Sequence, residues 1–204
     1  MADVRYGYKT NFVACIAGGS MIDRAIELAA RAHVGQVRKG TDIPYIAHPY
    51  AVGLMLAQAG CEDVIVAAGI LHDTVEDTDV TLEQLREQFG ERVASIVEGC
   101  SEPDRSKGWE ARKEHTLAYL PTAPRDVRLV SLADKLHNAR SILADLRRGG
   151  EETWLRFKRG RTQQAWYYRG LVAALCSPRP GEEPLPFCAE FKQVVEDLFG
   201  AEVG

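Results

Sequence analysis

Apolar residues recur along this chain at the three- and four-residue spacing that places them on one face of a helix. The segments SMIDRAIELAARAH and TLEQLREQFG both show this pattern. Each segment opens with two side chains that can cap a helix reciprocally, Ser20 with Asp23 and Thr81 with Gln84. The pattern therefore predicts helices that begin near residues 21 and 82.

Prolines and glycines mark further helix ends. Pro49 and Pro124 suit the first turn of a helix, and Gly60 and Gly90 suit the position after the last turn. Further helices are predicted at about 49–59, 63–77, 91–99, 109–120, 125–147, 152–175 and 187–199. The segment 63–77 is apolar nearly all round, as expected of a central helix. Because β-branched residues do not follow the alternating spacing of strands, the sequence predicts an all-α bundle.

The length of 204 residues fits one domain of ordinary size. Residues 20–200 are predicted to form this domain, with a Pro-rich loop at 177–186 before a short terminal helix. Residues 1–19 match no helical period. They are predicted to be a loosely ordered extension, unless Met21 is an alternative start.

Charge and cysteine content limit the classes of function. With 25 basic and 29 acidic residues the chain has a formal charge of −4, which gives no overall basic field for nucleic acid, although a local pocket for a small anion remains compatible. No apolar run reaches the roughly 18 residues of a membrane span. The five cysteines occur singly and in odd number, so reduced thiols in a cytoplasmic protein are expected.

A cluster of charge follows the most apolar stretch of the chain. The segment CEDVIVAAGIL leads directly into HDTVEDTD, which contains a His72–Asp73 doublet and then Glu76 and Asp77. Ionised groups next to a buried segment need partners. The sequence therefore indicates that the doublet has companions elsewhere in the chain.

Two segments supply candidate companions. His48 stands in YIAHPY at the start of a predicted helix, and Asp134 stands in the apolar helix LVSLADKLHNAR. Together with His72 and Asp73 they would make a site of two nitrogens and two carboxylates for a divalent transition metal, with positions open for water or phosphate oxygens.

Simpler interpretations of the same residues stay open. His48 could be a turn or capping histidine, and the His-Asp doublet could occur by chance. Asp134 could form a buried ion pair with Lys135 or Arg140. The remaining histidines lack comparable support and are expected to be structural or surface residues: His33, His115 and His137.

At these residues the sequence resembles the HD-domain metal-dependent phosphohydrolases. More narrowly, RKGTDIPYIAHP, AAGILHDTVEDTDVTLEQLREQFG and LVSLADKLHNAR are similar to the hydrolase domain of the RelA/SpoT homologues, and the chain resembles the small alarmone hydrolases, which include the Mesh1-like proteins. The resemblance runs from about residue 21 to 175. It implies an all-helical HD fold, one manganese ion per site, and removal of the 3′-diphosphate of (p)ppGpp to give GDP or GTP and pyrophosphate.

The resemblance also implies a role for individual residues. The implied metal ligands are His48, His72, Asp73 and Asp134. The implied acidic pair for water activation and proton transfer is Glu76 and Asp77. The implied nucleotide-binding residues are Arg38, Lys39, Tyr45, Asn138 and Arg161. Helical spacing supports the acidic pair, because Glu76 lies four residues after His72 and Asp77 four residues after Asp73.

The chain departs from the family pattern in three places, one of which is the segment CSEPDRSKGWE, whose difference from the longer hydrolases leaves the substrate open. The loop GTDIP after Arg38 and Lys39 is longer than the usual version, so Tyr45 could line the pocket or pack beneath the loop. Arg161 is chosen from RGRTQQAWYYRGL, where the register is ambiguous and the aromatic residues Trp166, Tyr167 and Tyr168 could belong to the core or to the pocket.

Three functions are compatible with these residues. The first is hydrolysis of (p)ppGpp. The second keeps the site but changes the nucleotide to (p)ppApp or NADPH. The third is a non-catalytic HD module that senses a nucleotide, which the presence of Glu76 and Asp77 disfavours.

Overall fold

The computed structural model describes residues 19–102, 104 and 106–200, so the predicted extension lies outside the described residues except for Gly19. The elements in chain order are α1 (Met21–Ala32), α2 (Ala47–Gln58), α3 (Asp63–Leu71), α4 (Thr74–Asp77), α5 (Leu82–Phe89), α6 (Glu91–Cys100), α7 (Trp109–Tyr119), α8 (Arg125–Gly149), the 3₁₀ helix η1 (Gly150–Arg156), α9 (Arg161–Cys176) and α10 (Cys188–Phe199). In this part of the chain, extended pairing is limited to a bridge between Val37 and Pro44. The all-α prediction is confirmed.

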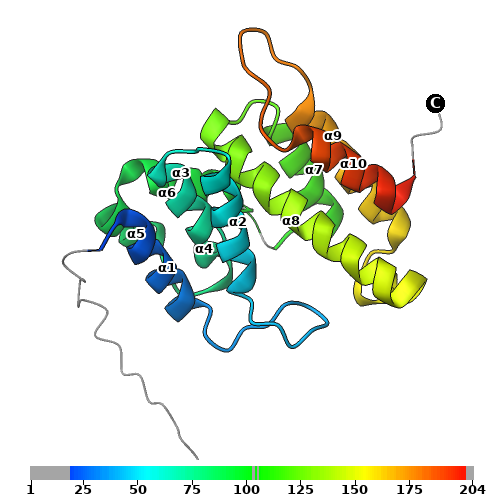
Figure 1. The fold of residues 1–204 in the computed structure, drawn as a ribbon, viewed down its shortest axis with the longest axis horizontal. Coiled ribbons are helices and arrows are strands. Elements are labelled where there is room, and N and C mark those ends of the chain that lie inside the picture. Colours follow the sequence, from blue (N-terminus) through cyan, green and yellow to red (C-terminus); the bar gives the residue numbers. More distant parts are fainter. Residues whose placement is uncertain (1–18, 103, 105, 201–204) are drawn as a thin grey trace, which may run out of the picture.

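The long helix α8 crosses the molecule between two groups of helices (Figure 1). It packs against α2, α3 and α6 on one side and against α10 on the other. The short helix α3 is buried almost all round and also contacts α1, α2 and α6. Its uniformly apolar sequence explains this central position, because a helix without a polar face must be covered on every side.

Two glycines let α2 and α3 approach closely. A Cβ atom added at Gly53 would lie 2.4 Å from Ile70 Cγ1, and one added at Gly69 would lie 2.4 Å from Leu56 Cδ1. A larger residue at either position would displace the buried side chain of Ile70 or Leu56. The contact therefore sets the distance between the start of α2, which carries His48, and the end of α3, which precedes His72.

The predicted helix at 63–77 is wrong in its continuity, because it is broken after Leu71. His72 Nδ1 donates to the Gly69 carbonyl over 2.8 Å, and Thr74 Oγ1 donates to the Leu71 carbonyl over 2.7 Å. In a continuous helix the backbone N–H groups of the following turn would take these carbonyls. The side chains replace the backbone donors and produce a turn at His72 and Asp73.

The predicted helix at 152–175 is also divided, into η1 and α9. Phe157 has extended backbone angles, φ −91° and ψ 131°, and Gly160 caps α9. The Phe157 ring lies between two cations, since Lys39 Nζ is 5.6 Å and Arg156 Cζ 5.0 Å from its centroid. Lys39 lies outside this segment, so tertiary contacts override the helical pattern of the sequence here.

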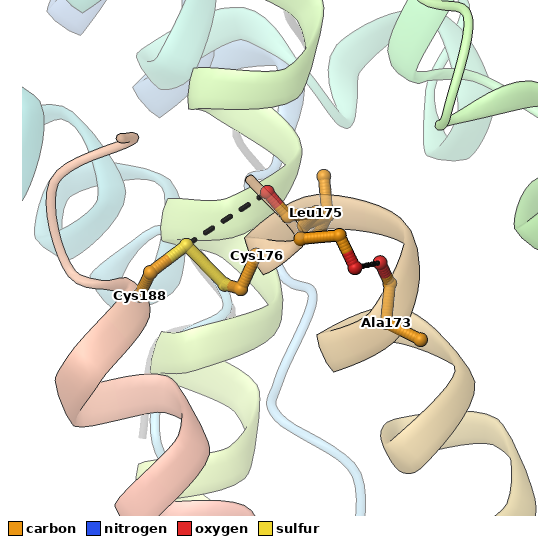
Figure 2. Close-up of a disulfide and its surroundings, with 5 residues drawn as sticks. Ala173, Leu175, Cys176 and Cys188 are labelled. Carbon is orange, nitrogen blue, oxygen red and sulfur yellow. Dashed lines mark hydrogen bonds between the residues drawn. A yellow bond between two sulfur atoms is a disulfide. The ribbon is translucent and has the colours of Figure 1, made fainter. Parts of the chain in front are cut away.

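The expectation of reduced thiols is wrong for one pair of cysteines. Cys176 and Cys188 form a disulfide, with a Cα–Cα distance of 5.4 Å, that joins the end of α9 to the start of α10 (Figure 2). The loop 177–187 folds back between these helices, so two cysteines that are isolated in the sequence meet in space. Cys61 and Cys100 are free thiols.

None of the described helices is both long enough and apolar enough to cross a membrane.

We expect Gly53→Ala to destabilise the protein by about 1–3 kcal/mol, because the new methyl group would overlap the buried Ile70 side chain. Urea unfolding followed by circular dichroism measures the change. Gly149→Ala is the matched control, since a Cβ there makes an ordinary 3.5 Å contact with Thr153. Equal stability of the two variants would contradict the close contact of α2 and α3.

We expect replacement of both Cys176 and Cys188 by alanine to cost about 2–4 kcal/mol, because the unfolded chain loses the closed loop. Thermal unfolding of the variant and of the oxidised protein gives the difference. Alkylation of the denatured, unreduced protein, followed by peptide mass mapping, should leave these two cysteines unlabelled while Cys61 and Cys100 react. Labelling of all of them would contradict the disulfide.

Candidate functional site

Two histidines and an aspartate converge inside the bundle. One ligand atom from each of His48, His72 and Asp134 lies within 4.8 Å of the other two, and all three residues are buried. Asp134 Oδ1 is 3.1 Å from His48 Nε2 and 3.7 Å from His72 Nε2. Asp73 Oδ2 lies 3.1 Å from His72 Nε2 and 3.6 Å from His48 Nε2. The structure thus brings together the four residues that the sequence predicted as ligands.

Three parts of the fold supply these side chains. His48 lies in the first turn of α2, His72 and Asp73 form the turn between α3 and α4, and Asp134 lies within α8. Adjacent residues on a continuous helix point about 100° apart. The turn after α3 is therefore what lets both members of the His-Asp doublet face one point.

The donor set of this cluster fits a divalent transition metal. His72 Nε2 is buried, and within the described residues it makes no hydrogen bond of acceptable geometry, although Asp73 Oδ2 lies 3.1 Å away. A buried polar atom without a partner costs free energy unless a ligand binds it. Imidazole nitrogens and carboxylate oxygens together suit divalent transition metals. The four residues could hold such a cation and leave coordination positions for water or phosphate.

Each histidine of the cluster is held through its second ring nitrogen. His72 Nδ1 donates to the Gly69 carbonyl, so in the neutral ring Nε2 carries the lone pair and is directed at the cluster. His48 Nδ1 lies 2.7 Å from Nδ1 of His137 on α8. Such outer contacts orient the imidazole rings of metal sites.

The carboxylates are held in the same way. Asp73 Oδ2 accepts a hydrogen bond from the Tyr45 hydroxyl over 2.6 Å. Asp134 Oδ2 accepts from Lys135 Nζ, and its Oδ1 accepts from Asn138 Nδ2, both over 2.6 Å. The ion pair between Asp134 and Lys135 is thus present together with the cluster, and does not replace it. Arg140 pairs instead with Glu190 of α10.

The electrostatics of the cluster favour ionised carboxylates. Burial raises the pKa of Asp134, but Lys135 and the two histidines outweigh burial and hold that pKa well below its usual value. Burial lowers the pKa of His48, which keeps its imidazole in the neutral form that binds metals. Burial also lowers the pKa of His72, yet Asp73 and Asp134 together raise it well above its usual value. The site therefore attracts positive charge to the point where the histidines and carboxylates meet.

The second acidic pair lies next to the cluster. Glu76 and Asp77 line the same cavity as His72, Asp73 and Asp134. The Glu76 carboxylate accepts a long hydrogen bond of 3.4 Å from the Glu102 backbone N–H. Burial, and then the charge of Glu102, raise the pKa of Glu76. A carboxyl group with a raised pKa binds a proton more readily than an ordinary glutamate.

Two cavities of different charge meet at the cluster. The acidic cavity, of about 580 Å³, has these charged lining residues: Asp73, Glu76, Asp77, Glu98, Glu102, Asp134, Lys113 and Lys135. The basic cavity, of about 410 Å³, has these: Arg38, Lys39, Arg148, Arg156 and Asp145. Tyr45 and Asn138 line both cavities. The four residues of the cluster therefore lie between a region that repels anions and a region that attracts them.

The predicted nucleotide-binding residues at the start of the chain lie in the basic cavity. Arg38 donates to Asn138 Oδ1 over 2.9 Å, and its Cζ is 5.8 Å from the centroid of the Tyr45 ring. Since Asn138 in turn donates to Asp134, a hydrogen-bonded chain runs from the basic cavity to the cluster. Lys39 also lines this cavity, beside Phe157. The structure thus brings Arg38, Lys39, Tyr45 and Asn138 to one place.

The structure does not bring Arg161 to the cluster. Arg161 donates to the Leu198 carbonyl of α10 and lines a different cavity with Trp166 and Arg169. This third cavity shares no lining residue with the acidic or the basic one. From the same helix, Tyr167 lines the acidic cavity and Tyr168 the basic cavity.

Sequence reasoning missed several residues of the site. The sequence predicts a structural or surface role for His137, yet it contacts the predicted ligand His48, and its position three residues after Asp134 on one helix is the available signal. Arg148 and Arg156 reach the basic cavity from the end of α8 and from η1. Both arginines stand in short basic clusters of the sequence, but no local pattern assigns them to this pocket, because the fold alone places these segments beside Arg38.

Comparison with known proteins places this arrangement in a family. The model of the family described as HD domain matches residues 25–156. MESH1 of Danio rerio, named a guanosine-3′,5′-bis(diphosphate) 3′-pyrophosphohydrolase, is 40% identical over 132 residues, which cover 63% of this chain and 71% of that protein. The GTP pyrophosphokinase of Streptomyces coelicolor is 45% identical over 125 residues, but these are 14% of its length. The chain thus spans a small part of that longer relative.

Two solved structures share the fold. The crystal structure of lmo0812 from Listeria monocytogenes EGD-e has a TM-score of 0.70 and 36% identity, covering 76% of this chain and 99% of that one. A metazoan ortholog of SpoT, described as hydrolyzing ppGpp, has a TM-score of 0.70 and 26% identity, covering 89% and 94%. The chain therefore belongs to the HD-domain family, in which its relatives include the MESH1 proteins.

Proposed function

We propose that the protein is a metal-dependent hydrolase that removes the 3′-diphosphate of (p)ppGpp. In this reaction one water molecule cleaves the bond between the ribose 3′-oxygen and phosphorus, which gives GDP or GTP and pyrophosphate. The observation that carries the proposal is the convergence of two histidines and two aspartates, with Glu76 and Asp77 lining the same cavity. The names of the MESH1 and SpoT-type relatives support the guanosine substrate.

The residues that would hold the metal, which we propose is one manganese ion, are His48, His72, Asp73 and Asp134. When bound, such a cation lowers the pKa of a coordinated water and neutralises phosphate charge. Asp134 would bind the metal as a carboxylate, because Lys135 helps to lower its pKa. His48 would bind as a neutral imidazole, because burial lowers its pKa. The outer partners fix the direction of each ligand atom.

Glu76 is the residue best placed to accept a proton from the attacking water. It lies one helical turn after His72, and burial and Glu102 raise its pKa toward the range in which a general base works efficiently. Asp77, in the same cavity, would pass a proton toward the leaving oxygen. Lys113 and Lys135 also line this cavity, where they pair with Glu102 and Asp134 and offset part of its negative charge.

The basic cavity would bind the rest of the nucleotide. Arg38, Lys39, Arg148 and Arg156 supply positive charge for phosphate groups, and Tyr45, Phe157 and Tyr168 supply aromatic surface for a base. With the nucleotide bound in this way, the scissile bond would lie at the cluster, between the two cavities. Asn138 lines both cavities and would contact the ribose or its phosphates.

We expect manganese-loaded protein to release pyrophosphate from ppGpp and pppGpp. Purified enzyme would be incubated with ppGpp, pppGpp, ppApp, NADPH and GMP, and the products separated by anion-exchange chromatography. Appearance of GDP from ppGpp in step with pyrophosphate supports the proposal. Turnover of ppApp or NADPH alone would move the same chemistry to another nucleotide, and no turnover of any compound would indicate a non-catalytic module.

We expect Asp73→Ala and Glu76→Gln to separate metal binding from catalysis. Loss of the Asp73 carboxylate removes a ligand, so metal content and turnover should fall together. Glu76→Gln keeps the shape of the side chain but removes the base, so metal content should stay while kcat falls by about 10²–10⁴-fold. Metal content is measured by inductively coupled plasma mass spectrometry after gel filtration.

The control for both variants is Asp79→Asn, an exposed carboxylate just outside the site. It should keep both metal content and kcat. Equal loss of metal in Asp73→Ala and Glu76→Gln would contradict the division of roles between the two acidic layers.

A further inference from the structure

The contact between His48 and His137 differs from the other contacts that hold the metal ligands. His137 lies on α8, three residues after Asp134, and reaches across to α2. The two Nδ1 atoms are 2.7 Å apart, and the ring centroids are 4.9 Å apart with planes inclined by 37°. His72 donates to a backbone carbonyl, which can only accept. His48 instead faces a group that can either donate or accept.

The position of His48 decides which nitrogen carries the hydrogen. Its Nε2 faces the cluster, 3.1 Å from Asp134 Oδ1 and 3.6 Å from Asp73 Oδ2. A neutral imidazole has one N–H and one lone pair, so an Nε2 that binds a cation leaves the hydrogen on Nδ1. Two nitrogens at 2.7 Å share a single hydrogen. Nδ1 of His137 must therefore present its lone pair to His48.

We propose that His137 is a positioning residue for the metal ligand His48. By accepting the hydrogen bond from His48 Nδ1–H, it fixes the tautomer in which Nε2 binds the metal and holds the ring in the plane that aims Nε2 at Asp134. This role concerns metal binding alone, so it does not depend on which nucleotide the enzyme hydrolyses.

The environment of His137 supports an acceptor role over simple packing. The residue lines the basic cavity together with Arg38, His48 and Asn138, so part of its ring faces open space and does not fill the core. A packing role and a hydrogen-bonding role predict different rankings of the substitutions of His137 by their effect on metal affinity. A packing residue needs its volume, whereas a hydrogen-bond acceptor needs only an atom with a lone pair near Nδ1.

Two substitutions separate volume from acceptor. His137→Phe keeps a ring of similar size but has no lone pair in the ring. His137→Asn is smaller, but its amide oxygen can lie near the position of Nδ1 and accept the hydrogen bond. We expect His137→Phe to weaken Mn²⁺ binding by about 10–100-fold, the range for outer partners of metal ligands, and His137→Asn to retain most of the affinity.

The Mn²⁺ affinity of the full chain is measured by competition with a chelator. Nucleotide is left out, so altered nucleotide binding in the basic cavity does not affect the result. Co²⁺ loading gives a second readout, since a change in the orientation of His48 alters the visible absorption spectrum. Thermal unfolding of the metal-free proteins reports any loss of packing. Trp166→Phe is the control, because this exposed ring lines the separate cavity on α9 with Arg161 and should leave metal affinity unchanged.

Wild-type affinity and spectrum in His137→Phe would overturn the proposal. Equal losses in His137→Phe and His137→Asn would also overturn it, because the acceptor would then make no difference. If His137→Phe does not fold, His137→Ala takes its place as the variant without an acceptor, and the same order relative to His137→Asn is required.

Discussion

The burial of two carboxylates beside two imidazoles is the constraint on which the rest of the structure depends. Asp73 and Asp134 would be costly inside a helical bundle without compensation. The structure provides it through Lys135, the Tyr45 hydroxyl and the adjacent histidines. Because these partners come from α2, α8, the turn after α3 and the loop before α2, all of these segments must hold their relative positions for the charges to be tolerated.

The same constraint divides the space around the cluster. The acidic cavity carries the negative charges of Glu76, Asp77 and Glu102. The basic cavity carries the positive charges of Arg38, Arg148 and Arg156. An anionic ligand would be drawn to the basic side, whereas the acidic side suits proton transfer. A substrate that spans both cavities would therefore bind in one direction.

The sequence predicted the helices that have regular apolar faces and reciprocal caps. It also predicted the four residues of the cluster, because a doublet after an apolar helix and an aspartate inside another both lack local compensation. It did not predict the break after Leu71, where side chains of His72 and Thr74 take the carbonyls of the backbone. Such competition depends on rotamers and on the cluster itself, which the apolar period of a segment does not encode.

Contacts between distant segments account for the other differences. Cys176 and Cys188 carry no pairing signal, and only the return of the loop 177–187 brings them together. Arg161 has the residue type expected of a phosphate ligand, but the orientation of α9 turns it toward the carbonyls at the end of α10. The contact of His137 with His48 is also not visible in the sequence, because the two residues are 89 positions apart in the chain.

Gly69 has two structural roles, and a substitution at this position would affect both. Its missing side chain permits the approach of α2, and its carbonyl orients His72. Any shift of α3 that made room for a larger residue there would also rotate an imidazole of the cluster. Metal affinity should therefore depend on how tightly this part of the core is packed. A substitution that touches no ligand could still weaken metal binding.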